Sequence, residues 1–299
     1  MIVSQHSERI GKMSDVSGVE LRKLQLATLK MAKYFVEFCN ENNLLCYFCG
    51  GGCIGAIRHG GFIPWDDDLD FFMPREDYEK LTILWKEKGD KENYALNRPD
   101  RDFQDRNSFI TLRDKNTTQI KTYQTDLDIV HGIVLDIFPI DGYPDSGFKR
   151  KLQCVDAMIF SLFCTGMVPS KHGKMLEYGS KFLLKLFSGK NIRYKIWKGA
   201  ERRMSKYKIQ DCKGITELCA GPGYMKNWYP KEAFESAEYH DFEDCKMPIP
   251  VGYDSYLKIA FGDYMKLPPK EKQVPAHDCV LIDTENSYIK YKNKFYCKE

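Results

Sequence analysis

The chain crowds four aspartates into five positions, Asp66, Asp67, Asp68 and Asp70. They stand between a tryptophan and two phenylalanines. Carboxylates this close repel one another and resist burial beside apolar residues, so we expect a positive group among them. In an extended stretch, alternate residues share a face and their Cα atoms lie ~6.6 Å apart. Asp66, Asp68 and Asp70 would then share one face, while Leu69 and Phe71 point into the core.

Carboxylates at this spacing can hold one divalent cation between them. Hard oxygen ligands without His or Cys favour Mg²⁺ or Mn²⁺, and Mg²⁺ in proteins often combines one or two carboxylates with phosphate oxygens of a substrate. Asp66 and Asp67 are expected to support the metal ligands from outside. A solvated acidic turn is the alternative interpretation, but the flanking aromatic residues argue against full exposure.

Three glycines, Gly50, Gly51 and Gly52, precede the acidic cluster. They allow the backbone to approach a ligand closely, and a helix predicted to start near Cys53 would aim free N–H groups at an anion. Arg58 on that helix could reach a phosphate or could pair with a surface acid. A glycine turn followed by a D-x-D strand favours metal-assisted transfer of a phosphate-linked group.

The elements that must position these residues follow from the hydrophobic pattern. Apolar residues at steps of three and four predict a helix over 19–42, and Pro74 opens another helix with Tyr78, Leu81 and Leu84 or Trp85 inward. The remaining expectations are short strands at 44–48 and 69–73, a helix at 53–59, three strands within 107–138, a loop at 139–147 and basic helices over 149–208.

Composition limits the class of protein. The chain has 299 residues, 43% of them apolar, and eleven cysteines, which is enough for a large core. The N-terminus shows no secretory leader, so we expect free thiols in a reducing cytoplasm. The apolar run from Cys154 to Val168 is interrupted by Asp156 and is too short to span a bilayer, which predicts a soluble or peripheral protein.

Charge is spread unevenly along the chain. Residues 171–208 hold twelve Lys and Arg against two Glu, a net +10, whereas the chain totals only +3 and the remainder therefore carries −7. In this basic segment Leu176, Gly179, Leu183 and Leu186 fall on one side of a predicted helix. We expect peripheral contact with an anionic membrane through 149–208, with a solvated helical hairpin as the alternative, and no nucleic-acid partner.

Three ordered blocks resemble the LicD family of phosphocholine transferases, to which the fukutin-related proteins are similar. They are GGGCIGAIRHGGFIPWDDDLDFFMPREDY, HGIVLDIFPIDG and MPIPVGYDSYLKIAFGDYMKLPP. The resemblance spans roughly residues 20 to 280. It implies an α+β fold with a nucleotidyltransferase-like mixed sheet, which we divide into a core at 1–148, a basic helical insertion at 149–208 and a C-terminal part at 209–299 that completes the cleft.

The resemblance also implies a function. It predicts a Mg²⁺-dependent (or Mn²⁺-dependent) transferase that moves phosphocholine from CDP-choline to a hydroxyl of a cell-surface glycan or its lipid-linked precursor and releases CMP. Asp68 and Asp70 match the metal-binding pair, Asp136 the third carboxylate, and Gly51 and Gly52 the glycine motif. The family often carries a hydroxyl residue where this chain has Gly52, a departure that bears on the identity of the donor.

Alternatives remain at several positions. A nucleotidyltransferase would use the same carboxylates and release pyrophosphate, and a silent glycan- or nucleotide-binding module would use none. Asp136 could be a buried structural acid, with Asp141 as the rival third carboxylate. His277 matches no metal spacing and is expected to be structural, although it follows the third block closely enough to face the cleft. The spacing C-x2-C-x3-C at Cys46 suggests zinc, but no partner pair follows it.

Aromatic residues are frequent in the last third of the chain. Most should lie in the core, but ring faces also hold quaternary ammonium groups, so a few could form a cage for choline. The candidates are Tyr224, Trp228, Tyr229, Tyr239, Phe242, Tyr253, Tyr256, Phe261 and Tyr264.

Overall fold

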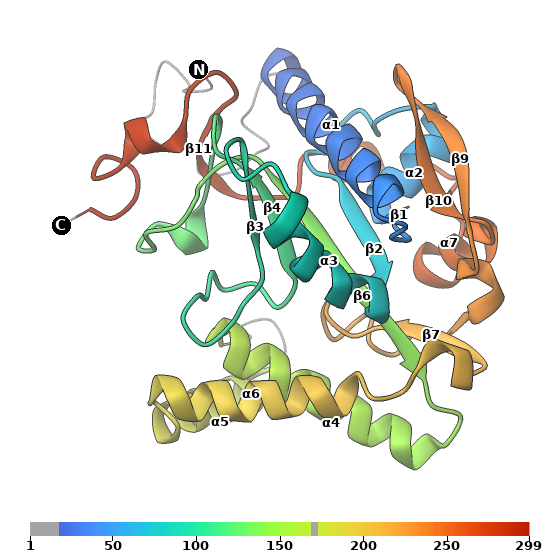
Figure 1. Cartoon of the computed structure of the whole chain (residues 1–299), viewed down its shortest axis with the longest axis vertical. Coiled ribbons are helices and arrows are strands. Elements are labelled where there is room, and N and C mark those ends of the chain that lie inside the picture. The colour runs from blue at the N-terminus through green and yellow to red at the C-terminus, as the bar shows by residue number, and fades with distance from the viewer. Residues whose placement is uncertain (1–17, 169–172, 299) are drawn as a thin grey trace. The chain divides into compact units, whose positions relative to one another are not determined.

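The computed structural model describes residues 18–168 and 173–298, and it combines helices and strands as the α+β prediction requires (Figure 1). The α-helices are α1 (Gly18–Glu41), α2 (Gly50–His59), α3 (Arg75–Lys88), α4 (Gly147–Thr165), α5 (Lys174–Leu186), α6 (Lys190–Met204) and α7 (Tyr253–Phe261). The strands are β1 (Tyr47–Cys49), β2 (Asp70–Pro74), β3 (Tyr94–Asn97), β4 (Ile110–Asp114), β5 (Thr118–Lys121), β6 (Val134–Tyr143), β7 (Gly214–Glu217), β8 (Tyr229–Pro230), β9 (Ala237–Phe242), β10 (Cys245–Pro250) and β11 (Cys279–Asp283).

The chain forms two compact units. The first comprises the residues up to Asn97, Thr111–Ile137 and the residues from Glu232 onward; the second comprises Arg98–Ile110 and Phe138–Lys231. Strand β6 begins in the first unit and ends in the second. The main sheet has the order β1-β2-β6-β4-β3, with β7 paired to β6 and β8 to β7.

The pairing of β1 with β2 brings the glycines next to the acidic cluster. These strands are antiparallel, with Phe48 opposite Phe71 and Cys49 opposite Asp70. Helix α2 begins at Gly50, directly after β1, and not near Cys53 as the sequence predicts. Strand β1 is correspondingly shorter than the predicted 44–48 segment. The glycine turn and the first residue of β2 are therefore neighbours in the sheet.

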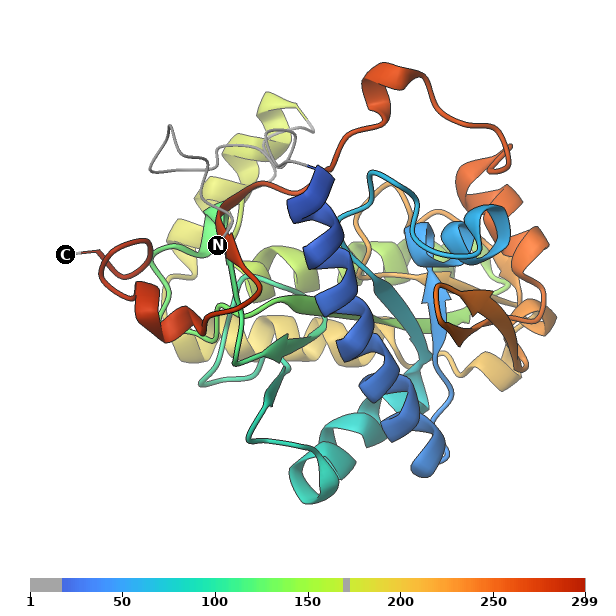
Figure 2. The ribbon, with the colours of Figure 1, turned by 90° about the horizontal axis from the view of Figure 1, so that it is seen from above.

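Helix α1 confirms the prediction for residues 19–42 and covers strands of the first unit (Figure 2). The Phe35 ring packs edge-on against Phe71 at 4.9 Å between ring centres, and Tyr34 stacks on Tyr94 at 4.7 Å. Helix α3 turns its predicted inner face to the same core, since Trp85 lies 5.2 Å from the ring of Phe38. These aromatic rings form a layer of the core that packs against β2 through Phe71.

The prediction of a loop at 139–147 is wrong for residues 139–143. Strand β6 continues to Tyr143, because β7 supplies an antiparallel partner with Asp141 opposite Thr216. Gly142 belongs to this ladder, and a Cβ there would lie 2.6 Å from the carbonyl oxygen of Tyr207. The composition of this stretch suggests a turn, but a strand more than seventy residues away makes it extended.

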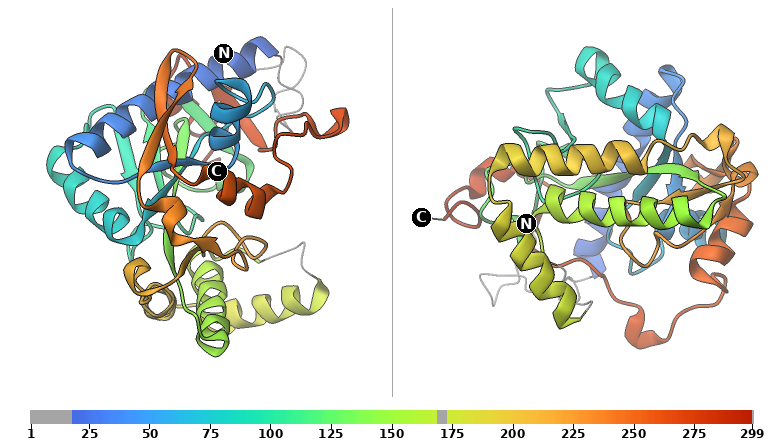
Figure 3. Two further views of the ribbon diagram at one scale, coloured as in Figure 1. Left: turned by 90° about the vertical axis from the view of Figure 1, so that its right-hand side faces the viewer. Right: turned by 90° about the horizontal axis from the view of Figure 1, so that it is seen from below.

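In the second unit, the predicted helical segment contains α4, α5 and α6. Helices α4 and α6 run side by side, and α5 lies at an angle to them (Figure 3). Their shared core is built around Trp197, which is 1% exposed and lies 5.9 Å from the ring of Phe160. None of the helices in the described residues combines the length and apolar character that crossing a membrane requires.

A close approach at Gly132 gives a first prediction. A Cβ at this position would lie 1.7 Å from the carbonyl oxygen of Asp114, so Gly132→Ala must displace backbone. We expect it to lower the free energy of unfolding by roughly 1 to 3 kcal/mol, measured by urea titration. Gly147→Ala is the matched control, since no atom lies within 4 Å of the added methyl. Equal stability of the two variants would contradict this packing.

Candidate functional site

Side chains along the acidic cluster alternate between the core and the opposite face, as the sequence predicts. Regular strand structure begins only at Asp70, but Leu69 and Phe71 are buried in the core. Asp66, Asp68 and Asp70 are each partly exposed, whereas Asp67 is buried. One carboxylate therefore faces inward and three share the opposite face.

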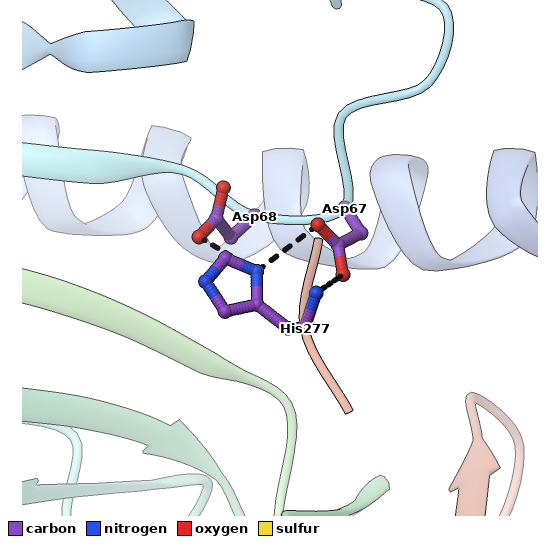
Figure 4. A group of neighbouring side chains, drawn as sticks. All are labelled: Asp67, Asp68 and His277. Atoms are coloured by element: carbon purple, nitrogen blue, oxygen red, sulfur yellow. Dashed lines mark hydrogen bonds and ion pairs between the residues drawn. The ribbon is translucent and has the colours of Figure 1, made fainter. Parts of the chain in front are cut away.

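The positive group expected among the aspartates is His277 (Figure 4). Its Nδ1 atom lies 3.1 Å from Asp67 Oδ1 and 3.3 Å from Asp68 Oδ2. The backbone N–H groups of Ala276 and His277 also donate to Asp67, at 3.4 and 3.2 Å. The prediction that His277 is only structural missed this ion pair, because no local spacing links residues more than two hundred positions apart.

The neighbouring carboxylates keep His277 charged. Its hydrogen bond to Asp67 and the nearby charge of Asp68 outweigh the burial of the ring and raise the pKa of His277 to about 10. The imidazole is therefore protonated at neutral pH and donates to Asp67. In this arrangement its Nδ1 has no lone pair for a metal ion.

A second cation, Lys121, lies at the third carboxylate. Lys121 Nζ is 3.5 Å from Asp136 Oδ2, and both side chains are largely buried. Burial disfavours the charged ammonium, but the Asp136 carboxylate and its neighbours outweigh that penalty, so the pKa of Lys121 is raised. Asp136 is on β6, which borders β2 in the sheet. The fold thus brings Asp68, Asp70 and Asp136 together, as the resemblance implies.

Two buried oxygens in this group lack a partner. Within the described residues, Asp70 Oδ1 and Asp136 Oδ1 are inaccessible to solvent and make no hydrogen bond. Burial raises the pKa of Asp70 well above its ordinary value, and the charges of Asp68 and Asp136 add to this effect. Burial also raises the pKa of Asp68, to which the charges of Asp67 and Asp136 add, although His277 and Lys121 counteract them. Unpaired carboxylate oxygens at one place in a core suit a hard divalent cation.

A second set of ligand atoms is also close together. One atom each from Asp67, Asp68 and His277 lie within 4.8 Å of one another, and this is the one such group found among the described residues. Both oxygens of Asp67, however, already accept hydrogen bonds from residues 276 and 277. We therefore favour Asp68, Asp70 and Asp136 as ligands and regard His277 as a counter-charge.

The glycines serve close packing at this site. Gly50 has a φ of +53°, a conformation that favours glycine, and its N–H donates to the Tyr256 hydroxyl at 3.0 Å. A Cβ on Gly51 would lie 1.9 Å from Asp66 Oδ2. At Gly52 a Cβ would meet the Phe48 ring at 3.2 Å. Gly51 therefore lets the Asp66 carboxylate lie against the start of α2, and the predicted phosphate contact stays a prediction.

Arg58 bonds to backbone carbonyl groups. Its Nη1 donates to the carbonyl oxygens of Tyr264 at 2.5 Å and Lys266 at 3.4 Å. Partial burial lowers the pKa of Arg58. In this structure Arg58 ties α2 to the turn after α7, and contact with a phosphate would require it to leave these carbonyls.

The remaining candidates are mostly buried residues. Asp141, the rival third carboxylate, belongs to the second unit and is fully buried on β6. Cys46, Cys49 and Cys53 are buried free thiols, and they are not part of the group of possible ligand atoms found in the described chain. Of the candidate cage aromatics, Tyr229, Phe242 and Tyr256 are core residues, as expected for most of them.

The two environments of Asp67 and Asp70 predict opposite effects of the same substitution. In protein without metal, Asp70→Asn should raise the free energy of unfolding by about 1 kcal/mol, because it removes a buried charge repelled by its neighbours. Asp67→Asn should lower it by roughly 1 to 3 kcal/mol, because it weakens hydrogen bonds to a charged acceptor. Urea titration at pH 7 with EDTA measures both, and shifts in the same direction would contradict this assignment.

Comparison with known proteins relates the chain to one family. Residues 43–157 match the family model described as LicD/FKTN/FKRP, nucleotidyltransferase domain, which includes Asp68, Asp70 and Asp136. The chain is 29% identical over 267 residues to the lipopolysaccharide cholinephosphotransferase LicD of Haemophilus influenzae, covering 86% of this chain and 96% of that protein. An uncharacterised protein of Rickettsia typhi is 35% identical over 93 residues, 29% of this chain and 30% of its own length. The resemblance to the LicD family is therefore confirmed, by the family model over residues 43–157 and by the Haemophilus protein over most of the chain.

Proposed function

We propose that this chain is a metal-dependent transferase that moves phosphocholine from CDP-choline to a hydroxyl of a cell-surface glycan or its lipid-linked precursor. The observation that carries the proposal is the pair of buried, unpartnered oxygens of Asp70 and Asp136. They lie on neighbouring strands inside the region that matches the LicD family model. The Haemophilus relative, which aligns over most of both chains, is a lipopolysaccharide cholinephosphotransferase and supports the same reaction class.

Asp68, Asp70 and Asp136 would hold Mg²⁺ or Mn²⁺. When bound, the cation neutralises charge on the diphosphate of the donor. The chain itself contributes two fixed positive charges, Lys121 and His277, which favour the approach of an anionic donor. Asp67 holds residues 276 and 277 beside the cluster and so keeps one of these charges in place.

The acceptor oxygen would form a bond to the phosphorus that carries choline, while the bond from this phosphorus to the bridging oxygen breaks and CMP leaves. The proton of the acceptor hydroxyl needs a base, and Asp136 is the candidate. Its Oδ2 lies 3.5 Å from Lys121 Nζ, so a positive charge is held directly beside the carboxylate that would act. Most of the remaining catalysis is alignment of the acceptor oxygen with the leaving group.

We further propose a cytoplasmic location. None of the eleven cysteines forms a disulfide in the structure, and eight of them are buried. Free thiols in this number are typical of proteins in a reducing compartment. A nucleotide-activated donor such as CDP-choline would be met in the same compartment.

Product analysis tests the reaction. Incubation with Mg²⁺, an acceptor glycan and a panel of CDP-alcohols should yield CMP and a phosphodiester. CDP-choline should be preferred over CDP-ethanolamine if ring faces hold the trimethylammonium, because a primary ammonium is costlier to dehydrate. Release of pyrophosphate from a nucleoside triphosphate would assign a nucleotidyltransferase instead, and no turnover of any donor would assign a binding module.

The three carboxylates give the sharpest prediction for turnover. Asp68→Asn and Asp70→Asn should each lose Mg²⁺-dependent donor binding and lower CMP release by ~10² or more. Asp136→Asn should lower CMP release as strongly while it keeps much of the donor affinity, because it acts on the acceptor side. Asp141→Asn in the other unit is the control and should retain turnover. An inactive Asp141→Asn beside an active Asp136→Asn would show that Asp141 is the third carboxylate.

A further inference from the structure

Helix α5 is held to its unit along one side. Among its described side chains Ser180 and Leu184 are buried, and Leu184 packs into the core that α4 and α6 share. Arg193 on α6 closes the C-terminal end of α5, donating to the carbonyl oxygens of Leu184 at 2.7 Å and Phe187 at 2.8 Å. The helix is therefore anchored firmly at one end while most of its circumference is free.

The opposite face of α5 is apolar and exposed. Met175 is 91% exposed, Tyr178 and Phe182 are each 65% exposed, and Leu186 is 60% exposed. Steps of three, four and four residues place these side chains in one stripe along the helix. A single exposed apolar residue needs no explanation, but a continuous stripe on one short helix indicates an interaction surface. Of the side predicted from the sequence, Leu186 belongs to this stripe, and the side chain of Leu176 lies outside the described part.

A row of lysines runs beside the stripe. Lys174, Lys181 and Lys185 follow at steps of seven and four residues, so they share the adjacent strip of the helix surface. Lys181 pairs with Glu177 at 2.6 Å. Lys174 and Lys185 form no ion pair in the part of the chain that the structure describes, and they are free to meet an external anion.

We propose that the face of α5 formed by Met175, Tyr178, Phe182 and Leu186 lies in the surface of an anionic bilayer, with the three lysines at the lipid headgroups. This is the arrangement of an interfacial amphipathic helix, which needs an apolar stripe and flanking positive charge. Charge complementarity favours the bilayer over a second copy of this chain, whose matching face would carry the same positive row. The proposal goes beyond the transferase reaction and does not depend on it.

Vesicle flotation of the full chain tests the proposal. The protein should float with vesicles of phosphatidylcholine and phosphatidylglycerol and should stay behind with phosphatidylcholine alone. Binding should weaken as salt rises, because charges are screened within ~8 Å at physiological ionic strength. Equal binding to neutral vesicles, salt-insensitive binding or no binding would overturn the proposal.

Two pairs of variants test whether vesicle binding depends on the stripe and its lysines or on any exposed apolar or basic side chain. Tyr178→Ser with Phe182→Ser should lower the bound fraction about tenfold, whereas Ile83→Ser, at an equally exposed apolar position on α3, should leave it unchanged. Lys174→Gln with Lys185→Gln should weaken binding more than Lys30→Gln with Lys86→Gln on α1 and α3. Unfolding midpoints should stay constant, because the substituted side chains are exposed.

Sedimentation velocity tests whether a second copy of the chain, and not a bilayer, covers this face. The chain without lipid should be monomeric, and the Tyr178 and Phe182 substitutions should not change its mass. A dimer that dissociates in the double variant would assign this face to a second copy and would contradict contact with a bilayer.

Discussion

The mutual repulsion of carboxylates at one point of the core is the constraint on which this site depends. Asp66, Asp67, Asp68, Asp70 and Asp136 are gathered there, and burial raises the cost of the charges on Asp66, Asp68 and Asp70. Two cations of the chain, His277 and Lys121, offset part of the repulsion. One oxygen each of Asp70 and Asp136 still has no hydrogen-bond partner among the described residues, so the cluster favours a further positive charge.

Several features of the fold hold these carboxylates close together. The register of β1 and β2 sets the glycine turn beside Asp70, and Gly51 leaves room for the Asp66 carboxylate. Phe71, on the opposite face of β2, is locked between the rings of Phe35 and Phe48. The aromatic packing thereby sets the position of the strand, and the strand sets where its carboxylates point. Stability supplied by the core allows the site to hold groups that destabilise the folded chain.

The sequence predicts what local patterns determine. The periodicities of α1 and α3, the alternation around Asp70 and the three carboxylates of the family motifs can all be recognised without the structure. The cation among the aspartates was expected, but its identity was not, since His277 lies 210 positions from Asp67 and no spacing joins them. Lys121 and the carbonyl partners of Arg58 were missed for the same reason. The extension of β6 depends on pairing with β7, which is also a non-local contact.

Manganese binding to the metal-free protein, followed by electron paramagnetic resonance of the free ion, tests the central claim most directly. The account predicts that the chain binds Mn²⁺, that Mg²⁺ displaces it, and that Asp70→Asn abolishes this binding while His277→Gln retains it. Undiminished Mn²⁺ binding by Asp70→Asn, together with its loss in His277→Gln, would assign the ion to Asp67, Asp68 and His277 and would contradict the account.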